Sequence, residues 1–200
     1  MNFPKKWCKF LSLIMLGVFC VSNMSYAHEF GPNSSYRWNN ISNMPVNADY
    51  IQDIPAYMFD TAIFDWNSKT GRTNFYKTSI SNSYIDFVDP INSEWGWGPF
   101  IVAVTLLKNS SNLWNIPCRY GSGGFTSGTA IRAVIEINPD TSLYSKIGTK
   151  NYLIRHELGH TLGLGHVPVD GSIASIMFPD TSSQWVAVQQ HDVDDVNAFY

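Results

Sequence analysis

Residues 156–166 read HELGHTLGLGH, and this stretch decides how the chain is interpreted. His156 and His160 are four residues apart, so on a helix both imidazoles lie on one face and can be directed at one metal ion. His166 follows after two glycines, and Gly163 is a residue that can take the positive φ of a sharp turn, which brings the third imidazole back. Three neutral imidazoles with a fourth position left open are typical of a catalytic zinc site, because structural zinc sites are normally closed by four protein ligands.

Glu157 lies between the first two histidines of this motif. A carboxylate there can take a proton from a zinc-activated water and pass it to a leaving amine. The simpler interpretation is an amphipathic helix with polar histidines and a solvated glutamate, and it explains neither the glycine nor the third histidine. The sequence therefore predicts that His156, His160 and His166 bind zinc and that Glu157 is catalytic.

The first 27 residues are predicted to be a signal peptide. Three lysines form a basic start, and residues 11–21 form an apolar run that is too short to span a bilayer. Ser25-Tyr26-Ala27 then supplies small residues at the −3 and −1 positions of a cleavage site. We therefore expect a secreted protein, extracellular or periplasmic, with no membrane anchor.

Cleavage would leave residues 28–200, a chain of 173 residues that is long enough for one domain with a hydrophobic core. It carries ten basic and sixteen acidic side chains, a net charge near −6, without a basic cluster. This balance argues against nucleic acid and anionic membranes as partners. Cys118 is the one cysteine left, which excludes a disulfide within the mature chain. We expect a buried or idle thiol, with an intermolecular bridge or a thiolate that reaches the zinc as alternatives.

The pattern of the remaining chain predicts a mixed α/β domain. Segments in which apolar and polar residues alternate, or that are mostly apolar, predict strands at residues 36–41, 73–78, 84–88, 100–107 and 130–137. The Ser-, Asn- and Gly-rich residues 109–128 are expected to form a long loop.

Three helices are expected. The zinc motif is placed on residues 152–162 with Asn151 as the cap, and a last helix on residues 189–199. An earlier helix is expected to start with Asp53 as cap and Pro55 in its first turn. Its core face is predicted to consist of Phe59, Ala62, Ile63 and Trp66.

Downstream of the zinc motif the chain reads Ser175-Ile176-Met177-Phe178-Pro179. HExxHxxGxxH followed by a Ser-x-Met segment resembles the metzincin metalloproteases. In that clan a tight turn carries the methionine beneath the zinc, so the resemblance implies this role for Met177. Without the nearby histidines, Met177 reads as an ordinary core methionine.

Within that clan the chain is most similar to the matrixins, the matrix-metalloprotease-like family. Residues 176–179, Ile-Met-Phe-Pro, resemble the matrixin Leu-Met-Tyr-Pro, and residues 190–200 resemble the last matrixin helix. The resemblance implies that the carboxylate of Asp192 supports the methionine turn, while His191 replaces the preceding family aspartate. Val167 stands where matrixins usually have serine after the third histidine.

The resemblance implies an α+β, metzincin-type catalytic domain over residues 28–200, with a mixed twisted sheet, a long zinc-binding helix and a C-terminal helix. It implies a zinc-dependent endopeptidase that cleaves protein or peptide substrates by a zinc-activated water, with Glu157 as general base and acid. By family analogy, the substrate is expected to lie extended along the strand at residues 100–107.

We expect one catalytic zinc ion. Apart from His28 and His191 no further histidine remains in residues 28–200, so the second, structural zinc of matrixins is not expected. A calcium ion stays an open alternative, although the sequence contains no recognisable calcium-binding loop. Its candidate oxygen ligands are Asp86, Asp89 and Asp140. There is no room after Ala27 for a propeptide with a cysteine switch, so the enzyme is either active once exported or restrained by a separate protein inhibitor.

Three alternatives stay open at this point. The chain could be an inactive zinc-binding relative, although the intact Glu157 argues against it. It could be a zinc hydrolase acting on something other than peptides, which the methionine segment disfavours. A gluzincin would need a distal glutamate ligand on a second helix, and the other glutamates of the mature chain lie in segments without that pattern: Glu29, Glu94 and Glu136.

Overall fold

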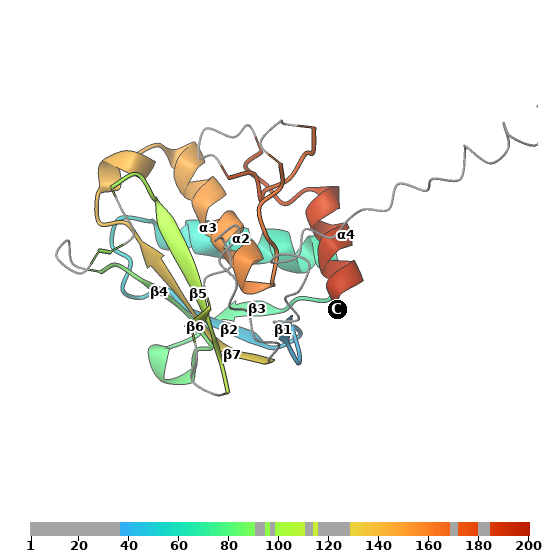
Figure 1. Cartoon of the computed structure of the whole chain (residues 1–200). Helices are drawn as coiled ribbons and strands as arrows, with labels where there is room; N and C mark the ends of the chain where they lie inside the picture. Colours follow the sequence, from blue (N-terminus) through green and yellow to red (C-terminus); the bar gives the residue numbers. More distant parts are fainter. Residues whose placement is uncertain are drawn as a thin grey trace, which may run out of the picture.

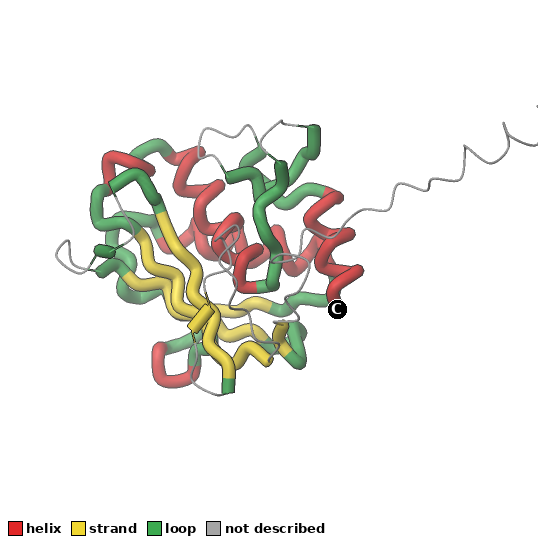
Figure 2. Tube along the Cα trace, in the orientation of Figure 1, coloured by secondary structure: helices red, strands yellow, loops and turns green. Residues whose placement is uncertain are grey.

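A mixed β-sheet with helices against one face forms the core of the molecule (Figures 1 and 2). The computed structural model describes residues 37–90, 95–96, 99–110, 114–115, 129–168, 172–179 and 185–200. The helices are α2 (Ala56–Thr70), α3 (Ile147–Thr161) and α4 (Gln190–Phe199), with two 3₁₀ helices, η1 (Ile80–Asn82) and η2 (Thr141–Tyr144). Helix α2 packs against both α3 and α4, and α3 packs against the sheet. The α+β fold class predicted from the sequence is confirmed.

The sheet is parallel except at one side. Its strands are β1 (Arg37–Trp38), β2 (Met44–Asn47), β3 (Phe75–Lys77), β4 (Ile85–Val88), β5 (Ala103–Asn109), β6 (Trp114–Asn115) and β7 (Thr129–Ile137). The order is β3-β2-β4-β7-β5-β6, and β1 pairs with β7. Strand β5 runs antiparallel to both β7 and β6, and the described part of β6 pairs with it only at Leu107 and Lys108. The outer edge of β5 before Leu107 is therefore not covered by any strand that the structure describes.

The start of the sheet differs from the prediction. A strand was expected at residues 36–41, and of its described part, residues 37–41, only Arg37–Trp38 is a strand. Asn40 turns the chain by accepting a hydrogen bond from the backbone N–H of Ser42 at 2.8 Å. The fully buried strand β2 was not predicted. It contains Pro45, which lacks a donor and normally argues against an interior strand.

The other strands lie close to their predicted positions. The predictions for residues 84–88 and 130–137 agree with β4 and β7, and β3 is a shorter form of the strand expected at residues 73–78. The strand expected at residues 100–107 begins only at Ala103, and Phe100 is 88% exposed. Residues 111–113 and 116–128 of the predicted loop, with Cys118, lie outside the described residues.

The zinc helix is longer than predicted at its N-terminal end. Helix α3 begins at Ile147 with Lys146 at the N-cap, so Asn151 is not a cap but an interior residue whose carbonyl accepts from Arg155 Nη1 at 2.9 Å. The sequence misses this start because residues 147–150 lack an apolar period. A tertiary contact holds them, since Lys150 Nζ donates to the carbonyl of Asp53 at 2.6 Å.

Helix α2 turns the expected side chains toward the core. Phe59, Ala62 and Trp66 are buried and Ile63 is partly buried, as predicted. Pro55, not Asp53, occupies the N-cap position, and Gly71 ends the helix at φ 61°. The indole N–H of Trp66 donates to the carbonyl of Arg155 at 3.0 Å, which attaches α2 to the zinc helix.

The C-terminal helix α4 confirms the prediction for residues 189–199. Gln189 is its N-cap, and a capping box joins the side chain of Gln189 to the backbone of Asp192 and the Asp192 side chain to the Gln189 backbone. No helix among the described residues is long and apolar enough to cross a membrane.

Candidate metal centre

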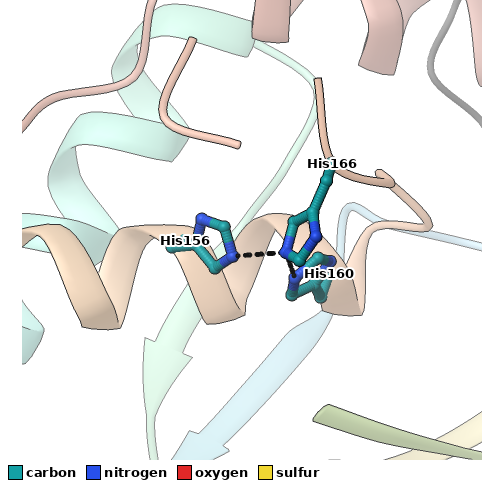
Figure 3. Close-up of side chains that lie close together, drawn as sticks. All are labelled: His156, His160 and His166. Carbon is teal, nitrogen blue, oxygen red and sulfur yellow. Dashed lines mark hydrogen bonds between the residues drawn. The ribbon is translucent and has the colours of Figure 1, made fainter. Parts of the chain in front are cut away.

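Three histidine side chains converge at the C-terminal half of α3 (Figure 3). His156 and His160 lie one helical turn apart on α3, and His166 returns from the segment after the helix. The Nε2 atom of His166 lies 3.1 Å from Nε2 of His156 and 3.2 Å from Nε2 of His160. Among the described residues this is the one group of three or more His, Cys, Asp or Glu donors close enough together to bind a metal ion.

The opposite ring nitrogens determine which tautomer the first two histidines adopt. Nδ1 of His156 lies 2.8 Å from the carbonyl of Ile176, and Nδ1 of His160 lies 2.7 Å from the carbonyl of Leu164. A carbonyl oxygen only accepts, so each Nδ1 carries the hydrogen and each Nε2 presents its lone pair to the centre of the triad. Lone pairs this close repel one another unless a cation lies between them.

The spacing of the donor atoms fits zinc. Tetrahedral Zn–N bonds of about 2.0–2.1 Å place two ligand nitrogens roughly 3.3 Å apart, close to the Nε2 separations found here. Burial lowers the pKa of His156 to about 3 and that of His166 to about 4, and it lowers the pKa of His160 well below its ordinary value. The imidazoles are therefore neutral at physiological pH, as a zinc ligand must be.

A tight turn after α3 brings His166 to the site. Gly163 has φ 91°, and a Cβ there would lie 2.7 Å from the ring of Phe199, so both conformation and space require glycine. Side chains from other parts of the chain bind the carbonyls at the end of the helix. Trp38 Nε1 donates to the carbonyl of Thr161 at 2.7 Å, and Tyr200 Oη donates to the carbonyl of Leu162 at 3.1 Å.

Met177 lies in a turn against the zinc helix. A Cβ added to Gly159 would overlap the sulfur of Met177, so the methionine touches the backbone of α3 between the two histidines. The carbonyl of Met177 accepts from the N–H of Val167 at 3.1 Å, next to His166. Met177 itself is buried, 2% exposed.

Asp192 is hydrogen-bonded to this turn from α4. Its carboxylate accepts from the hydroxyl of Ser175, from the N–H of Ile176 at 2.9 Å and from the N–H of Gln189 at 2.7 Å. The Ser175 hydroxyl in turn accepts from the N–H of Met177 at 2.8 Å. Burial raises the pKa of Asp192, and these bonds act against that rise. Asp192 thus joins the turn to the start of α4.

Glu157 is buried and contacts the sheet. The Thr105 hydroxyl of β5 donates to Oε2 of Glu157 at 2.6 Å, and Thr105 is fully buried. Burial raises the pKa of Glu157 to about 7, and the hydrogen bond from Thr105 opposes the rise. Sequence reasoning did not find Thr105, because 52 residues separate it from Glu157 and nothing in the β5 segment distinguishes it from other strand threonines.

Two of the three acidic residues considered for calcium, Asp86 and Asp140, have hydrogen-bond partners, whereas Oδ1 of Asp89 is buried without one among the described residues. The carboxylate of Asp86 accepts from Arg132 Nη2 at 2.6 Å, and that of Asp140 accepts from the Ser142 N–H at 3.1 Å. Asp89 is partly buried, and burial raises the pKa of its carboxyl. Within the described ranges no three acidic groups converge as the histidines do, so the structure adds no support for a calcium ion.

The fold and the histidine triad define a metzincin-type zinc metalloendopeptidase. The family model described as Matrixin matches residues 121–200, which include the histidine triad and the methionine turn. The part of the chain that holds the metal centre is therefore similar to the matrixin family, in agreement with the resemblance noted in the sequence. No curated protein matches the chain.

Proposed function

We propose that the chain is a secreted zinc-dependent endopeptidase in which Glu157 acts as general base and general acid. The observation that supports it best is the position of Glu157, buried on α3 between two histidines whose Nε2 atoms face a common centre. A zinc ion held by His156, His160 and His166 supplies a Lewis acid that activates water and polarises the scissile carbonyl.

The carboxylate of Glu157 would take a proton from the attacking water at one oxygen and deliver it to the nitrogen of the leaving amine. Burial raises the pKa of Glu157 to about 7, and the charge of a bound zinc ion would lower it, so that the carboxylate form needed to accept the proton would be favoured. Thr105 would keep Oε2 oriented during both steps.

We propose that an extended peptide pairs with the outer edge of β5. The edge from Ala103 to Leu106 is adjacent to no described strand, and Thr105 on the same strand contacts Glu157. A peptide added here would complete backbone hydrogen bonds and bring its carbonyls toward the zinc helix. This shifts the predicted substrate strand from residues 100–107 to the observed Ala103–Asn109.

Residues 1–27 would be removed as a signal peptide and residues 28–200 would form the catalytic domain. Met177 would be the apolar floor beneath the zinc and Asp192 the support of its turn, which their packing and hydrogen bonds favour.

The test is cleavage of a broad peptide library by residues 28–200 before and after removal of zinc. We expect cleavage that a chelator abolishes and that one equivalent of zinc restores. Zinc bound at one equivalent without cleavage of any peptide would reject the endopeptidase and favour the alternative, an inactive or non-peptidase zinc-binding relative. Secretion would be tested separately by comparing the culture medium with the cell fraction of cells that express the full chain. An uncleaved chain that still begins at Met1 and stays inside the cell would contradict secretion.

A further inference from the structure

Tyr152 contacts the metal centre without being one of its ligands. It lies on α3 one helical turn before His156, and the two ring centroids are 5.0 Å apart. The Tyr152 side chain is 2% exposed, and its Oη atom lies 2.8 Å from Nδ1 of His156. Tyr152 lies outside the zinc-binding motif, four residues before its first histidine, so the motif itself does not point to it.

The hydrogens of this contact can be assigned. The Tyr152 hydroxyl donates to the carbonyl of Phe178, just after Met177. A phenol has one hydrogen, so the oxygen of Tyr152 faces Nδ1 of His156 as an acceptor. Nδ1 therefore has two acceptors at 2.8 Å, the Tyr152 oxygen and the carbonyl of Ile176.

We propose that Tyr152 is a positioning residue for the zinc ligand His156, which it holds in the tautomer and ring orientation that direct Nε2 at the metal. The same hydroxyl connects the ligand to the segment after Met177, so the ring of His156 is attached to both its own helix and the methionine turn. Partners of this kind raise the affinity of a site by fixing the ligand before the metal binds. The inference rests on the zinc site of the proposed function but does not need the site to cleave peptides.

The first experiment compares zinc binding by the wild-type chain and by Tyr152→Phe, using competition with a chromophoric chelator. Loss of a partner in the outer shell of a metal site typically weakens binding by about 10- to 100-fold. Ile176 remains as an acceptor, so we expect the lower end, about tenfold in the zinc dissociation constant, with faster release of zinc from the loaded protein. Tyr144→Phe is the matched control, because Tyr144 is a buried tyrosine of η2 whose neighbours are the carboxylates of Asp53, Asp89 and Asp140.

A double-mutant cycle separates positioning from a general structural effect. Tyr152 is proposed to act only through His156, so Tyr152→Phe should weaken zinc binding in a His166→Ala background and have no further effect in a His156→Ala background. The melting temperature of the zinc-free proteins is a second measurement, and a purely structural role of Tyr152 would change it. Tyr152→Leu also lacks the hydroxyl and should reproduce the loss if Tyr152→Phe cannot be purified.

The inference is overturned if Tyr152→Phe binds and releases zinc like the wild type, or if its penalty persists unchanged in the His156→Ala background. It is also overturned if Tyr144→Phe loses the same affinity. A wild-type chain that binds zinc tightly and cleaves no peptide would reject the proposed endopeptidase alone, because the affinity comparison between Tyr152 and Tyr144 variants would still decide the role of Tyr152.

Discussion

The hydroxyl of Thr105 and the carboxylate of Glu157 meet at 2.6 Å inside the molecule, where the strand β5 faces the zinc helix. Thr105 also lies 3.4 Å from the backbone carbonyl of Glu157. One strand residue therefore contacts both the main chain and the side chain of the proposed catalytic glutamate. The strand expected to bind substrate is in this way coupled to the group expected to transfer the proton.

Thr105→Val should lower kcat without loss of zinc. Valine keeps the shape of threonine but removes the donor, and a hydrogen bond to a charged group contributes roughly 1.5–3 kcal/mol, so we expect a loss of about tenfold or more. Peptide cleavage kinetics and zinc stoichiometry measure the effect. Thr105→Ser keeps the donor and should retain most of the activity; equal losses in both variants would contradict the role of the hydroxyl.

Glu157→Ala should keep one zinc per chain and lose roughly 10³-fold or more in kcat/KM, because one carboxylate is proposed to act in two proton transfers. Metal analysis and peptide cleavage would be measured on the same sample. Turnover close to that of the wild type would remove Glu157 from the mechanism while leaving the zinc site intact.

Gly159→Ala should destabilise the protein through a clash. The new Cβ would overlap the Met177 sulfur and lie 3.1 Å from Cζ2 of Trp66, and overpacking of a core typically costs about 1–3 kcal/mol. Denaturant unfolding measures the change. The control is Gly148→Ala on the same helix, where nothing lies within 4 Å and alanine should stabilise by up to about 1 kcal/mol. A neutral Gly159→Ala would show that the methionine turn moves freely.

Asp65→Asn should loosen the packing of α2 on the zinc helix. Asp65 Oδ2 accepts from Arg155 Nε at 2.8 Å and from the Val188 N–H at 2.9 Å, and the Arg155 and Asp65 side chains are only 10% and 13% exposed. Burial raises the pKa of Asp65, but hydrogen bonds from Lys69, Val188 and Arg155 outweigh it and the pKa is lowered. We expect a loss of about 2 kcal/mol in the free energy of unfolding.

The matched control is Asp60→Asn, which removes an ion pair to Lys77 on the exposed side of α2. These side chains are 56% and 46% exposed, so the change should stay below about 1 kcal/mol. Similar losses for Asp65→Asn and Asp60→Asn would contradict the importance of the buried pair.

The zinc-free protein should lose stability as pH falls from about 6.5 to about 4. Histidines of an unfolded chain titrate near pH 6.5, whereas burial lowers the pKa of His156 to about 3 and that of His166 to about 4. In this window the unfolded state binds protons that the folded state does not, so the free energy of unfolding decreases as the pH is lowered. His160 acts in the same sense.

Glu157 acts in the opposite sense, because burial raises its pKa to about 7 and the folded state keeps a proton that the unfolded state loses above about 4.5. Burial also raises the pKa of Asp89 and Asp192, so these carboxyls act in the same sense as Glu157. Aspartates of an unfolded chain titrate only at about pH 4, below most of this window, so we expect the net slope to follow the three histidines. Melting of chelator-treated protein between about pH 7 and pH 4.5 measures the slope, and His166→Asn should reduce it. A melting temperature that rises toward low pH would contradict the prediction.

Local spacing was enough to identify the metal centre. His156, His160 and Glu157 are related by helical geometry, and Gly163 marks the turn that returns His166, so no distant contact is needed to infer the site. The apolar periods of α2, α4, β4 and β7 were readable for the same reason, because each period reports a face that is buried along its own element.

Long-range packing decided the rest. Thr105 reaches Glu157 across 52 residues, and the Tyr152 hydroxyl, which lies one helical turn from His156, donates to the carbonyl of Phe178 across 26 residues. Strand β2 forms around a proline because neighbouring strands hold it on both sides, and these contacts have no signature in any short stretch of chain. The zinc ligands can therefore be identified from the sequence. Thr105 and the carbonyl of Ile176, which contact Glu157 and His156, come from segments that only folding brings together.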